Sequence, residues 1–205
     1  MNKEFKVLDL FCGAGGLSWG LHKNKNFKTV VALDFDENAA NTFKKNMPEV
    51  EITKNDIKEK IIASAKRKKV NMIAGGPPCQ GYSMKGKKLG LADPRNFLFR
   101  EYLNIVKEIQ PEVFIIENVK GLLIASNGWF KDEIIQSIED LGYNVEYGIL
   151  NASDFGVPQS RERTIFICSQ KKKIPFPFST VDRKTTVRDA IGDLSYLNSG
   201  EGSFE

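Results

Sequence analysis

Short apolar runs alternate with helix-length segments from residue 5 to residue 141, and this alternation limits the fold more than any other feature of the sequence. The apolar runs predicted as strands are residues 5–11, 29–33, 51–53, 70–74 and 113–117. The segments predicted as helices begin near residue 17 and then cover 37–45, 57–68, 96–109 and 129–141. Strands that alternate with helices form a parallel sheet with helices on its faces. The sequence therefore predicts an α/β fold built on a doubly wound, mostly parallel sheet.

The pattern changes after the last of these helices. Two predicted strands, residues 145–150 and 164–168, have no helix-sized segment between them, so we expect an antiparallel pair at one edge of the sheet. Beyond residue 170 the regular pattern weakens, and only residues 186–191 are predicted as a short helix. We therefore divide the chain into a folded domain, residues 1–170, and a connector, residues 171–205.

Composition and charge exclude several classes of protein. The net charge of +4 permits a polyanionic partner without requiring one. The three cysteines, Cys12, Cys79 and Cys168, lie far apart and form no CxxC pair, which argues against a disulfide scaffold and predicts a reducing compartment. The single histidine excludes a histidine-rich metal site, and no metal is expected. No segment resembles a signal peptide or a membrane span, so we expect a cytoplasmic protein without a membrane partner.

The run at residues 70–74 ends in an unusual block. Two glycines and two prolines, residues 75–78, stop the run, and Cys79 and Gln80 follow at once. Open α/β sheets bind their ligands at the carboxyl ends of parallel strands, which is where this thiol is expected. The prolines restrict their own φ angles and the residues before them, and so hold the thiol in a stiff segment. A buried cysteine in an ordinary turn would not account for the whole block, so we interpret Cys79 as a nucleophile.

A glycine-rich turn follows the first predicted strand. Gly13 and Gly15 match the first two glycines of the dinucleotide fingerprint, whereas Ser18 occupies the place of the third. Asp34 follows the second strand, where it can accept hydrogen bonds from ribose hydroxyls, and Asp56 follows the third, where it can accept one from an adenine amino group. Each acid taken alone is more typical of a turn or a helix cap. Three consecutive strands that end in such residues favour an adenosine-bearing ligand, and NAD is among the ligands that they permit.

An acid also follows the fifth predicted strand. Residues 113–116 are uniformly apolar, which predicts burial on both faces, and Glu117 comes directly after them. Partial desolvation there would raise the pKa of Glu117 and allow it to hold a proton. A thiolate at Cys79 and a proton-sharing carboxyl in one pocket suit addition to a pyrimidine, in which sulfur attacks C6 and the acid stabilises positive charge at N3. The alternative is a glutamate that caps the following turn.

Basic residues occupy two places near this predicted pocket. Arg161 and Arg163 lie on the same side of an extended segment, where one could hold an oxygen acceptor. The alternative is that their charge protects an edge strand from aggregation. Five basic residues follow Cys79, the first three in a glycine-containing loop, and could contact a phosphate backbone: Lys85, Lys87, Lys88, Arg95 and Arg100. By contrast, residues 66–69 precede their strand and are interpreted as a solvated face at the opposite edge.

Four of these segments resemble ordered motifs of the DNA (cytosine-5) methyltransferases. They are residues 9–16 (Asp-Leu-Phe-Cys-Gly-Ala-Gly-Gly), 76–80 (Gly-Pro-Pro-Cys-Gln), 117–119 (Glu-Asn-Val) and 159–163 (Gln-Ser-Arg-Glu-Arg). The resemblance extends over residues 5–195. It implies a Rossmann-like fold of the S-adenosylmethionine-dependent methyltransferase type, with S-adenosylmethionine as the methyl donor. It also implies a cytosine flipped out of double-stranded DNA as the substrate and a role in a restriction-modification system.

The resemblance also implies roles for individual residues. Cys79 is the implied nucleophile, which forms a covalent adduct at C6 of cytosine before the methyl group is added to C5, and Glu117 is the implied contact to N3. Arg163, together with Arg161, is implied to hold the O2 side of the base. The residues implied to line the cofactor site are Phe11, Gly13, Gly15, Asp34, Phe35, Asp56, Ile57, Pro78 and Leu98.

The chain departs from the family pattern at its C-terminal end. In the family the pattern continues into a variable target-recognition domain and two further motifs, which are not found before Glu205. The resemblance therefore implies the catalytic portion of a methyltransferase, either truncated or one half of a split enzyme with a second polypeptide as its partner. Residues 1–170 are then the S-adenosylmethionine-binding catalytic domain, and residues 171–205 lead toward the recognition domain.

Three other functions are compatible with some of these features. A tRNA cytosine-5 methyltransferase would share the same pocket, and the domain that distinguishes the two substrates is not found in the sequence. A non-catalytic cofactor-binding subunit would not need Cys79 or Glu117, both of which are present. A nicotinamide oxidoreductase would leave Cys79 without a role and would lack the third glycine, at residue 18.

Overall fold

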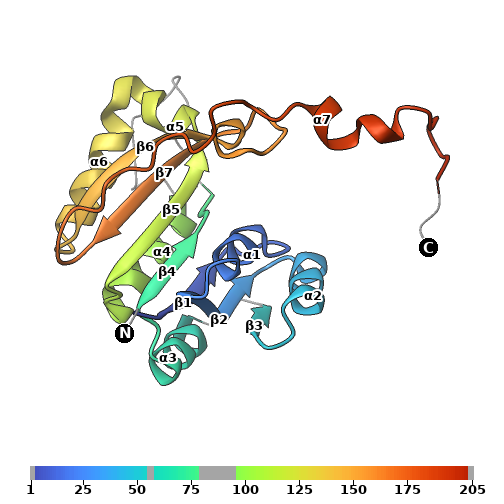
Figure 1. The fold of residues 1–205 in the computed structure, drawn as a ribbon. Helices are drawn as coiled ribbons and strands as arrows, with labels where there is room; N and C mark the ends of the chain where they lie inside the picture. Colours follow the sequence, from blue (N-terminus) through green and yellow to red (C-terminus); the bar gives the residue numbers. More distant parts are fainter. Residues whose placement is uncertain (1–2, 55–57, 79–95, 203–205) are drawn as a thin grey trace.

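A computed structural model describes residues 3–54, 58–78 and 96–202, and these form a seven-stranded sheet with helices (Figure 1). In chain order the strands are β1 (Phe5–Leu10), β2 (Phe27–Asp34), β3 (Glu51–Lys54), β4 (Met72–Gly75), β5 (Val113–Val119), β6 (Asn144–Asn151) and β7 (Glu162–Ser169). The α-helices are α1 (Gly16–His22), α2 (Glu37–Asn46), α3 (Lys58–Lys68), α4 (Phe97–Ile109), α5 (Gly121–Ile124), α6 (Trp129–Glu139) and α7 (Val187–Ile191). Every strand and helix predicted from the sequence is present close to its predicted position, and α5 is an additional helix.

The sheet order is β3-β2-β1-β4-β5-β7-β6, and the first five of these strands are parallel. β7 runs antiparallel to both of its neighbours, β5 and β6. The predicted antiparallel pair at one edge is therefore confirmed, with β6 outermost and the reversed strand next to it. Because β1 pairs with β2 on one side and β4 on the other, the strand order reverses between β1 and β4. Ligands of doubly wound sheets bind outside the carboxyl ends of the strands at such a switch point.

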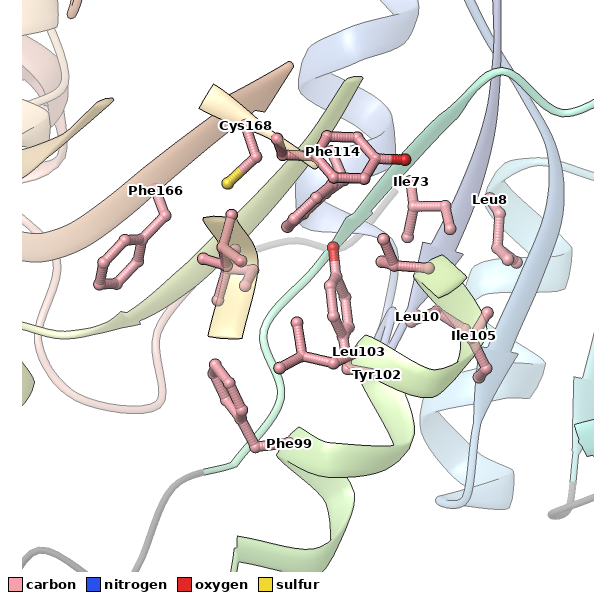
Figure 2. Close-up of a cluster of buried hydrophobic side chains, with 14 of the residues drawn as sticks. Leu8, Leu10, Ile73, Phe99, Tyr102, Leu103, Ile105, Phe114, Phe166 and Cys168 are labelled. Carbon is pink, nitrogen blue, oxygen red and sulfur yellow. The ribbon is translucent and has the colours of Figure 1, made fainter. Parts of the chain in front are cut away.

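Helices cover both faces of the sheet, as the alternation of side chains along β1 shows. Leu8 and Leu10 belong to a large buried cluster to which α3, α4 and α6 contribute (Figure 2). Val7 belongs to a separate cluster, against which Leu21 of α1 packs. Since successive side chains of a strand point to opposite faces, Asp9 lies on the same face as Val7, which is the face of α1. The central part of the sheet therefore carries a carboxylate on a covered face.

The large cluster contains tyrosines whose hydroxyl groups are hydrogen-bonded. Tyr102 of α4 is fully buried, and its hydroxyl donates to the carbonyl oxygen of Ile115 at 2.9 Å. Its ring centre lies 6.2 Å from that of Phe114, which meets the ring of Tyr143 edge-on at 4.8 Å. The Tyr143 hydroxyl donates to the carbonyl oxygen of Pro111 at 2.7 Å. The contacts of Tyr102 with Ile115 and Phe114 hold α4 against β5 (Figure 2). The carboxyl end of β5 carries the predicted acid.

β5 differs from its prediction in one respect. Phe114 and Ile116 are fully buried, but Val113, Ile115 and Glu117, which alternate with them, are only half-buried. The prediction of a strand buried on both faces is therefore wrong, because the face opposite Phe114 is incompletely covered. An apolar run cannot reveal this by itself, since the extent of covering depends on segments distant in the sequence.

Two helices begin at local hydrogen bonds that the sequence encodes. Asp36 caps α2, and its Oδ1 accepts hydrogen bonds from the N–H groups of Asn38 at 2.8 Å and Ala39 at 3.1 Å. Thr186 and Asp189 form a capping box at α7, in which each side chain accepts a hydrogen bond from the backbone N–H of the other. Both helix starts therefore follow from the residue types at these positions.

The segment after β7 packs on the domain before it leaves it. Phe176 lies against Gly148 of β6, where a β-carbon would meet the phenylalanine ring at 2.7 Å. Ser179 donates through Oγ to the carbonyl oxygen of Asp154 at 3.0 Å, and Lys184 pairs with the carboxylate of Asp154 at 2.8 Å. Beyond these contacts the chain leads away from the sheet, and α7 lies apart from it (Figure 1). The first part of the predicted connector is therefore attached to the domain.

Gly148→Ala should loosen this attachment. The added methyl group occupies the position of the Phe176 ring, so the ring must leave the strand and the segment loses an apolar contact. If the loss is about 1 kcal/mol, the detached form becomes about fivefold more populated, and trypsin should cleave at residues 171–173 faster by about the same factor. Gly20→Ala is the control, because a β-carbon there meets no atom of the described structure within 4 Å. Equal cleavage rates in the two variants would show that Phe176 does not anchor the segment.

Candidate functional site

The turn between β1 and α1 has a backbone conformation that requires glycine. Gly13 has a φ of 55° and Gly15 a φ of 97°, both in the left-handed region. A β-carbon on Gly15 would lie 2.6 Å from Cε of Met47 and 2.9 Å from a ring atom of Phe43, so the turn packs directly on α2 and the residue after it. Around Gly13, by contrast, no atom of the described structure lies within 4 Å of a β-carbon position. The turn therefore presents bare backbone at Gly13.

Asp34, at the end of β2, connects this turn to the next strand. Its Oδ2 accepts a hydrogen bond from the N–H of Gly13 at 2.7 Å, and its Oδ1 accepts one from the N–H of Asp36 at 2.9 Å. A carboxylate has further lone pairs, so Asp34 can still accept hydrogen bonds from ribose hydroxyls. Phe35 is 42% exposed, and its ring centre lies 6.1 Å from that of Phe11. The predicted cofactor residues at the ends of β1 and β2 therefore lie together.

Glu117 forms ion pairs with both of the predicted arginines. Its Oε1 lies 2.9 Å from Nε of Arg163 and 3.8 Å from Nη2 of Arg161. The register explains the closer contact, because Arg163 of β7 pairs with Val119, two residues beyond Glu117 on the same face of β5. The structure thus brings together three of the four predicted catalytic residues. Their ion pairs were not predicted, since they depend on the pairing of β7 with β5.

The segment after β4 packs beside these ion pairs. A β-carbon on Gly76 would lie 3.0 Å from Oε2 of Glu117, so glycine there leaves room for the carboxylate. Asn118 is buried, and its Nδ2 donates to the carbonyl oxygen of Pro77 at 2.8 Å. Asn118 therefore fixes the proline segment relative to Glu117, a role that the sequence analysis did not assign to it. The motif Glu-Asn-Val was the only sequence signal for it.

Asp9 is a buried acid that the sequence analysis treated only as part of a strand and a motif. It is 1% exposed, and its Oδ2 accepts a hydrogen bond from the hydroxyl of Ser18 at 2.5 Å. Ser18 in turn accepts one from the hydroxyl of Thr29 at 3.0 Å. Oδ1 has no hydrogen-bond partner among the described residues. Burial is the main reason that the pKa of Asp9 is raised to about 7.

An open cavity of about 440 Å³ connects the glycine turn with the ion pairs. Its lining residues come from β1, α1, the ends of β4 and β5, and the approach to β7: Asp9, Phe11, Cys12, Gly16, Leu17, Gly76, Glu117 and Arg161. The cavity therefore lies at the switch point of the sheet, between β1 and β4. Burial raises the pKa of the Cys12 thiol well above its usual range, so Cys12 is a neutral wall residue and not a second thiolate.

Several predicted residues lie outside the part of the chain that the structure describes. These are Cys79, Asp56 and Ile57 of the site and Lys85, Lys87, Lys88 and Arg95 of the basic region. Pro78 is exposed at the end of the described segment after β4, and Leu98 is half-buried in the first turn of α4. Within the described ranges, no group of three acidic, cysteine or histidine side chains could hold a metal ion. In the same ranges, no helix has the length and apolar composition needed to cross a bilayer.

Comparison with known families narrows the set of functions that the sequence left open. Residues 5–201 match the model of the C-5 cytosine-specific DNA methylase family. The chain belongs to this family. The family resemblance of the sequence is therefore confirmed, and membership of the DNA methylases excludes a nicotinamide oxidoreductase.

Bacterial Type II methyltransferases are among the relatives of the chain. The chain is 38% identical over 204 residues to M1.HphI of Haemophilus parahaemolyticus. This alignment covers 96% of this chain and 55% of the relative. It is 42% identical over 195 residues to M.FnuDI of Fusobacterium nucleatum, with 92% of this chain and 55% of the relative covered. The chain is 40% identical over 193 residues to M.AquIA of Picosynechococcus sp., and this alignment covers 86% of this chain and 77% of the relative. The chain thus spans about half the length of the first two relatives.

Solved structures share the fold of the chain. A prophage-encoded E. coli protein described as a DNA modification methyltransferase superposes with a TM-score of 0.75 at 30% identity, over 92% of this chain and 54% of that chain. The Dnmt2 methyltransferase of S. pombe superposes with a TM-score of 0.66 at 23% identity, over 99% of this chain and 58% of that chain, and this likeness concerns the fold alone. The predicted methyltransferase-type sheet is therefore confirmed.

Proposed function

We propose that the chain is the catalytic part of a DNA (cytosine-5) methyltransferase. It transfers a methyl group from S-adenosylmethionine to C5 of a cytosine that is flipped out of double-stranded DNA. The observation that carries this proposal is the cavity at the switch point, whose lining includes Phe11 and Cys12 beside the glycine turn as well as Glu117 and Arg161. A methyl donor and a base must approach each other closely to react, and one cavity that reaches both groups of residues permits this.

The residues around the glycine turn fit S-adenosylmethionine. When bound, this cofactor supplies a methyl group activated by a sulfonium. The bare backbone at Gly13 allows close approach, and the carboxylate of Asp34 accepts the ribose hydroxyls. Phe11 and Phe35 offer aromatic surface to the adenine. The remaining residues proposed for this site follow from the family resemblance: Gly15, Asp56, Ile57, Pro78 and Leu98.

Asp34→Ala should weaken S-adenosylmethionine binding by about 1–3 kcal/mol, the contribution of a lost buried hydrogen bond to a charged group. The variant also removes the contact that holds the N–H of Gly13, so the turn loses one of its links to β2 and keeps the hydrogen bond from the N–H of Cys12 to the carbonyl oxygen of Leu33. Isothermal titration calorimetry measures the dissociation constant directly. Asp36→Ala is the control, because it removes the side-chain cap of α2 and keeps the backbone N–H that Asp36 donates to Asp34. An unchanged dissociation constant in Asp34→Ala would show that Asp34 does not bind the cofactor and has only a structural role in the turn.

In the proposed reaction Cys79 and Glu117 act together on the base. The sulfur of Cys79 adds to C6 while Glu117 shares its proton with N3, so electron density accumulates at C5, where the methyl group is received. Loss of the C5 proton and of the sulfur then restores the aromatic ring and the free thiol. Arg163 orients Glu117 through the contact of Nε with Oε1 at 2.9 Å. Arg161, on the wall of the cavity, supplies donors to the O2 side of the base.

The proposal includes the division of the chain and its partners. Residues 1–170 bind the cofactor and carry the catalytic residues, and residues 171–205 lead toward a target-recognition domain on this or a second polypeptide. Double-stranded DNA is the macromolecular substrate, and the basic residues after Cys79 suit its phosphate backbone. The Type II methyltransferases among the relatives support a role in restriction-modification.

Transfer of tritiated methyl groups from S-adenosylmethionine by the chain combined with a target-recognition domain tests this function. We expect label in unmethylated duplex DNA and none in tRNA, and bisulfite sequencing should locate 5-methylcytosine in the product. The label that the Cys79→Ala variant incorporates defines the background of the assay. Label in tRNA alone would favour the RNA alternative, and a protein that binds S-adenosylmethionine but labels neither substrate would favour the non-catalytic alternative.

A further inference from the structure

The turn between β6 and β7 brings Arg161 to the wall of the cavity. β6 ends at Asn151, which pairs with Glu162 of β7, and Arg161 directly precedes β7. The side chain of Arg161 is 50% exposed, and the ion pair that it forms with Oε1 of Glu117 is long, at 3.8 Å. A contact of this length at a half-exposed place fixes an arginine poorly, because the side chain keeps much of its rotamer freedom. The position of Arg161 therefore depends on how its backbone is held.

The side chain of Asn151 holds this backbone. Its Oδ1 accepts a hydrogen bond from the N–H of Arg161 at 3.1 Å and a second one from the N–H of Ser153 at 3.2 Å. Its Nδ2 donates to Oγ of Ser160 at 3.4 Å. The carbonyl oxygen of Arg161 accepts a hydrogen bond from the N–H of Ala152 at 3.0 Å. Both backbone polar groups of Arg161 are therefore bonded to Asn151 or to the residue after it.

The same side chain also caps a short helix. Asn151 is the cap of the 3₁₀ helix Ala152–Phe155, which ends at Gly156 with a φ of 84°. A short side chain with an acceptor oxygen is typical of such caps, and here the oxygen also reaches across the turn to Arg161. The 3₁₀ helix and Arg161 thus share one acceptor atom, Oδ1 of Asn151. Loss of this atom would release both.

Arg163 is held in a different way. Its Nε lies 2.9 Å from Oε1 of Glu117, and its Nη1 donates to the carbonyl oxygen of Glu162 at 2.8 Å. It also lies within β7, which is hydrogen-bonded to β5 on one side and to β6 on the other. The acceptor on Asn151 therefore bears on Arg161 and not on Arg163.

We propose that Asn151 is a positioning residue for methyl transfer. Its Oδ1 sets the backbone of Arg161, so that the guanidinium is directed into the cavity toward an oxygen acceptor of the base. This inference rests on the proposed function, because the base supplies the acceptor. Arg161 touches the base, whereas Asn151 acts through Arg161. A guanidinium presents its donors in fixed directions, so a displacement of about 1 Å costs up to about 100-fold in rate.

Single-turnover methyl transfer to duplex DNA, by the chain combined with a target-recognition domain, tests this inference. Asn151→Ala should lower the rate by about 10- to 100-fold and leave the dissociation constant for S-adenosylmethionine unchanged. Asn151→Asp keeps an acceptor for both N–H groups, and its second oxygen can accept a hydrogen bond from the hydroxyl of Ser160. This conservative variant should therefore recover the rate to within about threefold of wild type.

Asn144→Ala is the matched control. Asn144 lies at the other end of β6, where its Nδ2 donates to the carbonyl oxygen of Ser169 at 3.2 Å. Both alanine variants lose an amide at an end of the same strand, so each should lower the unfolding temperature by about 2–4 °C, but only Asn151→Ala should lower the rate. Asn151→Ser keeps a capping oxygen for the 3₁₀ helix and lacks the length to reach Arg161. It should lose rate as Asn151→Ala does, and it replaces that variant if Asn151→Ala unfolds.

A double-mutant cycle separates positioning from stability. Arg161→Ala removes the guanidinium and keeps the backbone N–H that Asn151 accepts. In the Arg161→Ala background, Asn151→Ala should therefore lower the rate by less than about twofold further. Equal losses in the two backgrounds, or a loss in Asn151→Asp as large as that in Asn151→Ala, would overturn the inference while the proposed function stands. A wild-type protein that transfers no methyl group to DNA in this assay would overturn both.

Discussion

Glu117→Gln should reduce the rate of methyl transfer by about two to four decades, because glutamine keeps the shape of the side chain but cannot share a proton with N3. The structure shows how closely this side chain is held in place. The carboxylate is held by Nε of Arg163 at 2.9 Å and fits against the backbone of Gly76, where even a methyl group would crowd it. A glutamine side chain would keep this position and could still form hydrogen bonds, but it has no carboxyl proton to share with N3. Single-turnover methyl transfer to duplex DNA measures the effect without a contribution from product release.

Glu146→Gln is the matched control for this variant. Glu146 of β6 has a side chain that is 33% exposed, against 31% for Glu117, and it also forms an ion pair, with Lys173 at 3.1 Å. The same chemical change there should leave the rate within about a few-fold of wild type, since it is a surface substitution away from the cavity. If Glu117→Gln had as little effect as this control, the proton-sharing role at N3 would be wrong.

Cys79→Ala should abolish methyl transfer, because no other group on the chain is expected to add to C6 and so activate C5. The prediction comes from the sequence block of residues 75–80. Cys168→Ala is the control. Burial raises the pKa of the Cys168 thiol well above its usual range, so this cysteine is a neutral core residue, and its removal should affect stability more than rate. Methyl transfer by Cys79→Ala at a rate near that of Cys168→Ala would contradict the assignment of the nucleophile.

Much of the fold follows from local sequence. The alternation of apolar runs with helical segments predicts the elements, and the missing helix between the last two strands predicts their antiparallel pairing, as β6 and β7 show. The coverage of β5 was not predictable, because it depends on packing by distant segments. The attachment of Phe176 to Gly148 was not predictable for the same reason. Hydrophobic periodicity reports which residues avoid water and says little about which distant segment covers them.

The candidate site was also predictable from the sequence only in part. Asp34 and Glu117 were identified because each follows a predicted parallel strand, and such strand ends meet at one edge of a sheet. The buried chain from Thr29 through Ser18 to Asp9 was not identified, because three different elements contribute one residue each. An acid within an apolar strand was the available signal, and only the structure shows that its second oxygen lacks a partner among the described residues.

The central claim is that Cys79 forms a covalent bond to C6 of cytosine in a pocket that it shares with Glu117. Its most direct test is trapping on duplex DNA in which 5-fluorocytosine replaces cytosine, with S-adenosylmethionine present. Fluorine cannot leave C5 as the proton does, so the adduct should persist after methyl transfer, and peptide mass spectrometry should locate it. We predict an adduct on Cys79 in the wild-type protein, much less of it in Glu117→Gln, and none in Cys79→Ala. An adduct in Cys79→Ala, or none in a wild-type protein that binds both S-adenosylmethionine and DNA, would contradict the claim.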